Sequence, residues 1–225
     1  MNILALDTST EYCSTAVWRD GALFERDVHA GQRHSELLLG MIDEVLAESG
    51  VTVAGLDAIA YGSGPGTFTG LRIGCGVAQG LAYAADRPTV GVGTLLALAT
   101  GSGATRVVCC LDARMQQVYY AAYVYESLAW RAAHEPALYA PALVPDIAGE
   151  GWTGCGSGFI AYRDVLTQRY GNQLSRIVPD AHPRARDIAE LAVAAYRNGE
   201  ATAADDAMPW YIRDKVALKT DERTT

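Results

Sequence analysis

The chain has 225 residues, half of them apolar, and carries a net charge of −8. That length is enough to bury a core, either as one domain or as two small lobes. Since no run of Lys and Arg offsets the acidic balance, we do not expect the chain to hold nucleic acid by itself through phosphate contacts.

The start of the chain and its cysteines indicate a cytoplasmic protein. The first residues contain no basic region and already include Asp7, which excludes a secretory signal peptide. No run of eighteen or more apolar residues occurs, so we expect no membrane span. The 5 cysteines are scattered and form no CxxC pair, which predicts buried free thiols in a reducing compartment.

The first thirty residues predict three antiparallel strands. Residues 3–7 form a short apolar run that ends at Asp7. Residues 13–18 and 22–29 flank Asp20-Gly21, a pair typical of two-residue hairpin turns.

Residues 34–49 predict a helix that ends at Gly50. Its apolar residues recur at helical spacing, and Leu39 and Leu46 widen the apolar face beyond what one core requires. We interpret this excess as the sign of a partner surface.

A second helix is predicted at residues 67–85, after a strand at 56–61 and an irregular glycine-rich turn at 62–66. Each glycine costs up to ~1 kcal/mol in a helix interior. So many small residues therefore predict that another backbone packs closely against this helix. The glycines are Gly70, Gly74, Gly76 and Gly80.

The second half of the chain repeats the pattern of the first. A strand at 89–92 and a short helix at 94–100 precede Gly101-Ser102-Gly103, which predicts a boundary between lobes. A segment rich in Pro and Ala separates two groups of later elements. We predict strands at 106–111, 117–124 and 152–153, and helices at 159–170 and 184–198.

Each half also has an aspartate at the turn between its first strands, Asp7 and Asp112. Two such lobes around a cleft are typical of actin/hexokinase-like (ASKHA) proteins, whose lobes are ribonuclease H-like. We therefore predict an α/β fold with lobes at residues 1–101 and 102–208. The remaining tail, residues 209–225, is expected to return to the first lobe.

Several segments together resemble the TsaB (YeaZ) family of tRNA threonylcarbamoyladenosine proteins. Residues 3–10 (ILALDTST) resemble its first-strand motif, and residues 34–38 (HSELL) the start of its first helix. The most specific match is the eleven-residue hallmark at 64–74 (GPGTFTGLRIG). Asp112-Ala113-Arg114 and Tyr211-Ile212-Arg213 also fit the family.

The resemblance implies an inactive relative of the TsaD threonylcarbamoyl transferase. The transferases carry a His-x-x-x-His metal motif after the strand that follows this hallmark helix, and Thr94 and Leu98 stand at those two positions here. The implied function is that of a non-catalytic partner subunit that scaffolds and stabilises TsaD, with no cofactor required. The implied partners are TsaD and the ATPase TsaE, while tRNA is reached only through them.

The resemblance further implies that the two predicted helices form the interface with the transferase. A homodimer that uses the same patch is expected when the chain is alone. The predicted interface residues are Leu37, Leu38, Met41, Ile42, Val45, Gly70, Leu71, Ile73, Gly74 and Val77.

A vestigial nucleotide cleft is the other predicted site. The Asp7–Thr10 turn has two interpretations: a phosphate-binding turn, or a hairpin turn capped by its own side chains. With Asp112 as a second metal–phosphate carboxylate and residues 154–158 as an adenosine loop, the first interpretation supports an alternative function, a kinase or ATPase that binds Mg-ATP. The predicted cleft residues are Asp7, Thr8, Ser9, Thr10, Asp112, Gly154, Gly156 and Gly158.

Two further enzyme classes find no support in the sequence. A metallopeptidase needs metal ligands, and none of the 4 histidines stands three or four residues from another. A serine hydrolase of the Gly-x-Ser-x-Gly type is excluded at Ser63 and Ser157, because residue 61 is Tyr and residue 155 is Cys.

Overall fold

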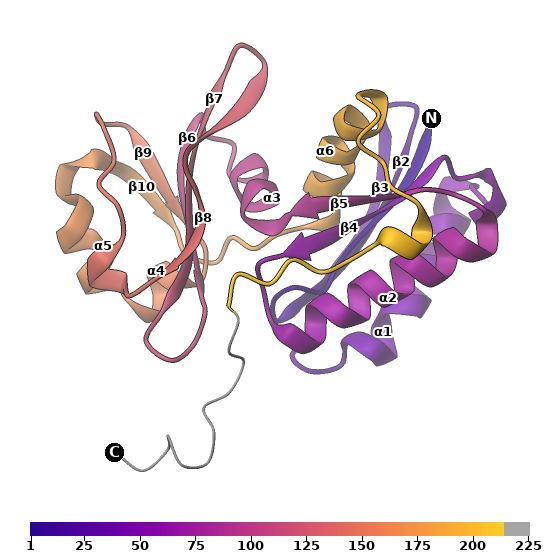
Figure 1. Ribbon diagram of the computed structural model, residues 1–225, viewed down its shortest axis with the longest axis horizontal. Coiled ribbons are helices and arrows are strands. Elements are labelled where there is room, and N and C mark those ends of the chain that lie inside the picture. Colours follow the sequence, from indigo (N-terminus) through magenta and orange to yellow (C-terminus); the bar gives the residue numbers. More distant parts are fainter. Residues whose placement is uncertain (214–225) are drawn as a thin grey trace.

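The computed structural model describes residues 1–213, which form two five-stranded sheets that each anchor one lobe (Figure 1). The first sheet has the order β3-β2-β1-β4-β5, with β1–β2–β3 antiparallel and β4 and β5 parallel to β1. The predicted antiparallel opening is confirmed. The strands are β1 (Asn2–Asp7), β2 (Tyr12–Arg19), β3 (Ala22–His29), β4 (Ala58–Gly64) and β5 (Thr89–Gly93).

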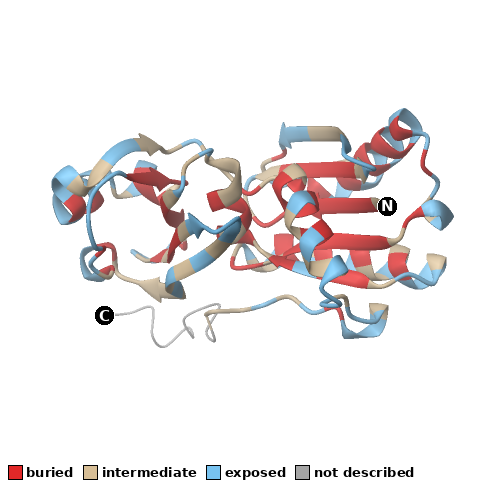
Figure 2. Cartoon of the chain, turned by 90° about the horizontal axis from the view of Figure 1, so that it is seen from above, coloured by how far each residue is buried: buried red, intermediate tan, exposed pale blue. Residues whose placement is uncertain are grey.

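The first sheet is covered on both faces by helices. Because side chains alternate along a strand, β1 serves two cores. Leu4 and Leu6 pack with α1 (His34–Ser49) and α2 (Phe68–Ala85), while Ile3 and Ala5 pack with α6 (Ala185–Arg197). Figure 2 shows the result, a first sheet in which β1, β2, β4 and β5 are mostly buried, while the edge strand β3 is exposed or half-buried.

The second sheet has the order β10-β9-β6-β7-β8. Its helices α4 (Gly158–Ala161) and α5 (Arg163–Tyr170) cover one face, and α3 (Thr94–Gly101) covers the other and lies between the lobes. The strands are β6 (Arg106–Asp112), β7 (Val118–Glu126), β8 (Ala129–Tyr139), β9 (Trp152–Cys155) and β10 (Leu174–Val178). Short 3-10 turns lie at Val53–Gly55, Pro141–Leu143, Gly171–Gln173 and Ala204–Asp206.

Two strands of the second lobe were not predicted. Strand β8 includes part of the Pro- and Ala-rich segment, and its Pro136 is tolerated because β8 lies at the edge of the sheet. Strand β10 also lies at an edge, and its side chains are exposed or half-buried, so no clean apolar alternation marks it.

The predicted lobe boundary at residue 208 is wrong. Helix α6 packs against β1, β2, β4 and β5 of the first sheet, because Ile188 and Ala192 fill the core behind Ile3 and Ala5. The chain therefore returns to the first lobe through residues 179–184, which we call the returning segment.

Residues 209–213 run back along the first lobe. The Trp210 backbone N–H donates to the Ser63 carbonyl at 2.7 Å, and the Tyr61 hydroxyl bonds to the main chain of Met208. Arg213 then reaches Gln117 of the second lobe at 2.6 Å. The rest of the predicted tail, residues 214–225, lies outside the described residues.

Two expectations about composition can be checked directly. All five cysteines are buried and unpaired, as predicted. Burial raises the pKa of both Cys13 and Cys155 to about 12, so these thiols stay uncharged at neutral pH. No helix within residues 1–213 is long and apolar enough to cross a membrane.

Candidate functional site

A cleft of about 620 Å³ separates the two lobes. Its first-lobe wall consists of the turn after β1 and the loop before α2, and its second-lobe wall of the turn after β6 and the start of α4. The returning segment and residues 210–213 complete it. Its polar lining includes Ser9, Thr10, Glu11, Tyr12, His29, Asp112, Arg114, Ser157, Asp180, His182 and Arg213.

Asp7 lies at the end of β1 but beneath the cleft rather than in its wall. Its side chain is enclosed, and the residue is only 1% exposed. One oxygen, Oδ1, accepts from the Ser9 N–H at 3.0 Å and from the Ser9 hydroxyl at 2.8 Å. The other, Oδ2, has no hydrogen-bond partner within the described residues. Burial raises the pKa of Asp7 to about 7, so the predicted metal–phosphate carboxylate is a buried group that does not line the cleft.

Thr8 is also buried, and it explains two glycines of α2. Its hydroxyl donates to the Gly70 carbonyl at 2.7 Å. A Cβ at Gly70 would overlap the Thr8 carbonyl oxygen, and one at Gly74 would lie 2.6 Å from the Thr8 hydroxyl. These glycines therefore allow the helix to approach this chain's own turn, and the prediction that they contact a partner is wrong.

The predicted adenosine loop is filled by the chain itself. A Cβ at Gly154 would lie 2.5 Å from the Phe159 ring, and one at Gly158 would lie 2.7 Å from Cys110 Cβ. Gly156 has a φ of +101° and packs on the Cys110 carbonyl. The glycines satisfy close packing around α4 and leave no surface there for a base.

Asp112 does line the cleft, but its carboxylate is already paired. Its Oδ2 lies 3.2 Å from the Arg114 guanidinium, and its Oδ1 accepts from the Arg114 N–H at 2.9 Å. The same guanidinium reaches Glu11 of the first lobe at 2.8 Å, which ties the two lobes together. Of the eight predicted cleft residues, only Ser9, Thr10 and Asp112 line the cavity.

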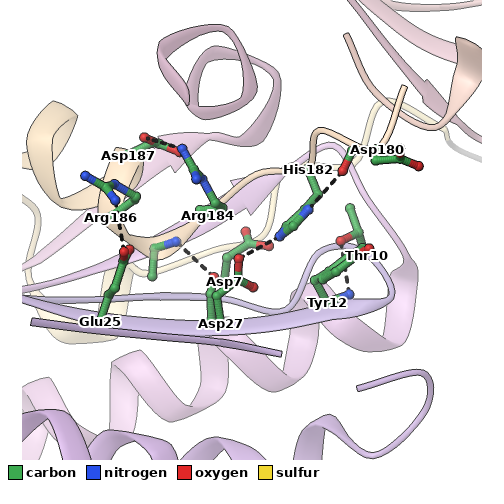
Figure 3. Close-up of polar contacts among 12 residues, drawn as sticks. Asp7, Thr10, Tyr12, Glu25, Asp27, Asp180, His182, Arg184, Arg186 and Asp187 are labelled. Carbon is green, nitrogen blue, oxygen red and sulfur yellow. Dashed lines mark hydrogen bonds and ion pairs between the residues drawn. The ribbon is translucent and has the colours of Figure 1, made fainter. Parts of the chain in front are cut away.

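Two clusters at the cleft were not predicted from the sequence. In one, the His182 ring lies flat on Tyr12 and bonds to Asp27, as Figure 3 shows. In the other, Arg72 lies 3.8 Å over the Phe68 ring and donates to the Tyr211 hydroxyl at 3.0 Å. In each cluster, contacting residues are more than a hundred positions apart in the sequence, so no spacing pattern predicts the contact. Of these residues, the family motif at 64–74 had marked Phe68 and Arg72 of the second cluster.

The predicted interface on α1 is wrong for most of its residues. Leu38 is 1% exposed and packs in the core, because α1 turns this face toward β2 and the first sheet. Of the two residues whose excess suggested a partner, Leu46 is buried in this internal core and Leu39 is exposed. A Leu38→Asp change would disrupt folding rather than a partner contact. Met41, Ile42 and Val45 are buried in the same core, and the predicted residue Leu71 of α2 is buried as well.

The remaining predicted residues of these helices, Leu37, Ile73 and Val77, are half-buried and lie toward the outer surface of α1 and α2, which lie side by side (Figure 1). On α2, residues 73, 76, 77 and 80 follow helical spacing and share one face. A Cβ at Gly40, Gly76 or Gly80 would meet nothing within 4 Å. We call this set the outer stripe: Leu37 and Gly40 of α1 with Ile73, Gly76, Val77 and Gly80 of α2.

Comparison with known proteins relates the chain to one family over nearly its whole length. Residues 28–220 match the family described as TsaD, tRNA N6-adenosine threonylcarbamoyltransferase. The tRNA threonylcarbamoyladenosine biosynthesis protein TsaB of Escherichia coli is 38% identical over 231 residues, which cover 97% of both chains. The chain belongs to the TsaB family. The TsaB protein of Haemophilus influenzae is 34% identical over 97% of this chain and 96% of its own.

Solved structures of TsaB-type proteins share the fold. YeaZ from Pseudomonas aeruginosa has a TM-score of 0.85 at 38% identity and covers 93% of this chain and 99% of its own. A second Pseudomonas aeruginosa structure, described as an uncharacterized protein with similarity to peptidase YEAZ, has a TM-score of 0.87 at 37% identity over 94% and 99%.

Thr94 and Leu98, the two positions predicted to replace the metal-binding histidines of the transferases, lie one turn apart on α3, and both are buried. Across residues 1–213, no group of three or more His, Cys, Asp or Glu side chains is placed to hold a metal ion.

Proposed function

We propose that this chain is a non-catalytic subunit in the threonylcarbamoylation of tRNA adenosine, and that it stabilises a TsaD-type transferase in the cytoplasm. The observation that carries the proposal is the similarity to proteins named TsaB over 97% of the chain. The buried Thr94 and Leu98 support a subunit without its own chemistry, since neither side chain replaces an imidazole ligand.

The outer stripe is the proposed contact with the transferase. Glycine in the middle of a helix costs about 1 kcal/mol relative to alanine. Within residues 1–213, nothing at Gly40, Gly76 and Gly80 explains the missing side chain. The close approach of a second backbone explains why glycines stand there, and Tyr83 of α2, which is 73% exposed and one turn beyond Gly80, extends the contact.

A single charged side chain on the stripe tests this proposal. We expect Gly80→Glu to fold normally, because the added Cβ meets open space and glutamate favours helix. Its carboxylate would be forced into an apolar contact, so transferase binding and tRNA modification should fall at least ~10-fold. The measurement is threonylcarbamoylation in a reconstituted mixture of this chain with TsaD-type and TsaE-type partners.

Thr167→Glu is the matched control, since it adds the same charge to an exposed helix position of the second lobe. Its activity should equal that of the unmodified chain. Full modification by a folded Gly80→Glu variant would refute the outer stripe as the contact, and modification without any chain present would refute the proposed role.

The same stripe is proposed to close a homodimer when the chain is alone. Two copies can oppose their stripes around a two-fold axis, and this arrangement excludes the transferase from the same surface. Sedimentation should then show a dimer for the unmodified chain and a monomer for Gly80→Glu.

A further inference from the structure

The returning segment leads into α6, whose first residues are attached to the first lobe. The Ala185 N–H donates to the Ser14 hydroxyl at 2.9 Å, and Arg186 pairs with Glu25 at 2.9 Å. His182 is the contact nearest the second lobe. Only residues 179–181 separate it from the end of β10 at Val178.

The side chain of His182 contacts two strands of the first sheet (Figure 3). Its ring stacks on Tyr12 of β2, with ring centroids 3.5 Å apart and planes inclined by 7°. Its Nε2 lies 2.9 Å from Asp27 Oδ2 of β3. Tyr12 is held in turn by His29, whose ring meets it edge-on at 5.2 Å.

Both ring nitrogens of His182 face acceptors. Nε2 faces the Asp27 carboxylate, and Nδ1 lies 3.3 Å from the Asp180 carbonyl. The ring is therefore positioned by a polar contact at each of its nitrogens.

Two carboxylates lie near His182, namely Asp27 and, beneath it, the buried Asp7. Burial raises the pKa of Asp7, and the charge of His182 acts on that pKa in the opposite direction. The neighbouring Cys13 thiol stays uncharged, and His29 contacts Tyr12 rather than His182. The nearest cation of the same segment, Arg184, is bound to Asp187 at 3.0 Å.

We propose that His182 controls a hinge between the lobes. Its ring, stacked on Tyr12 and bound to Asp27, fixes where the returning segment leaves the first lobe and so sets the width of the cleft. Tyr12, His29 and residues 179–182 all line that cleft. When the His182 contacts are lost, the part of the chain that is not bound to the first lobe becomes longer than residues 179–181. The second lobe can then move away from the first. The inference does not depend on the proposed partner.

A spin-label distance across the hinge tests the proposal. Cysteines introduced as Ala22→Cys in the first lobe and Leu128→Cys at the exposed tip of the second place labels far from the cleft, while the native cysteines are buried. With the unmodified hinge we expect one narrow distance distribution.

Two variants distinguish loss of the His182 contacts from a general loosening of the fold. His182→Phe retains the stack but cannot bond to Asp27, and Asp27→Asn leaves the stack in place and removes the ion pair. Both should give a broader, shifted distribution while circular dichroism shows an intact fold. A distribution that is the same in the unmodified chain and both variants would overturn the proposal.

Discussion

At the scale of single residues, Asp7 shows how burial changes the role of a motif. The Asp-Thr-Ser-Thr turn has the residue types of a phosphate site, but the carboxylate is turned inward to bind Ser9. A Cβ at Gly62 would overlap Asp7 Oδ2, so that side of the carboxylate is closed by backbone. Of the two interpretations of this turn, the structure supports the one in which its own side chains cap it.

The raised pKa of Asp7 predicts a pH-dependent stability. Burial gives this aspartate a folded-state pKa of about 7 against an ordinary value of 3.8, so the folded state binds the proton more tightly than the unfolded chain does. Its contribution to stability is therefore complete below pH about 4 and is lost as the pH rises to about 7. A pKa that differs by one between the folded and unfolded states corresponds to about 1.4 kcal/mol, so the whole effect is several kcal/mol.

Asp7→Asn should remove this dependence, because the amide oxygen can still accept from Ser9. Urea unfolding across this pH range should show the wild-type free energy of unfolding falling relative to that of the variant, with the variant the more stable above pH about 7. Parallel curves for the two proteins would show that Asp7 titrates in the folded protein as it does in the unfolded chain.

At the scale of elements, helix α2 contains two classes of glycine that the sequence does not distinguish. Gly70 and Gly74 face the Thr8 turn, where no Cβ fits, and Gly76 and Gly80 face outward into open space. Glycines of both classes occur at similar spacing along the helix. Only the position of the helix on the first sheet decides which glycines serve the core and which belong to the outer stripe.

A pair of alanine substitutions measures this difference. Gly70→Ala should destabilise the chain by about 1–3 kcal/mol, because the new methyl overlaps the Thr8 carbonyl. Gly76→Ala should stabilise it by up to about 1 kcal/mol through helix propensity alone. Denaturant unfolding of the two variants gives the comparison, and equal effects at both positions would contradict the assignment of the two faces.

At the scale of the whole molecule, the cleft between the lobes is large, but most of the residues predicted to bind a nucleotide there are buried or already paired. Asp7 is buried, Asp112 is paired with Arg114, and the glycines at 154–158 are packed on Cys110 and Phe159. The alternative function as a kinase or ATPase requires these groups to face a bound nucleotide and its metal. Their arrangement therefore favours the partner subunit over the enzyme.

Calorimetric titration of the isolated chain with Mg-ATP tests the alternative. We expect no heat of binding at micromolar protein and millimolar nucleotide, because Asp112 would have to exchange Arg114 for the metal. Arg114→Ala is the informative variant, since it frees the carboxylate. Tight binding by the unmodified chain would restore the nucleotide cleft as a functional site.

The sequence by itself determined the local elements and the family of this protein. The strands of the hairpin at Asp20-Gly21, the helix ended by Gly50 and the motif at residues 64–74 all follow from neighbours a few residues apart. Turn chemistry, capping and periodicity act over that range, which is why these predictions agree with the structure.

Only the tertiary structure decided which residues are available for function. Contacts between residues that are tens to more than a hundred positions apart bury Asp7 and Leu38 and return α6 to the first lobe. The same kind of contact places His182 beside Asp27. No local pattern predicts such contacts, because the apolar face of a helix has the same residue spacing whether a sheet of its own chain or another protein covers it.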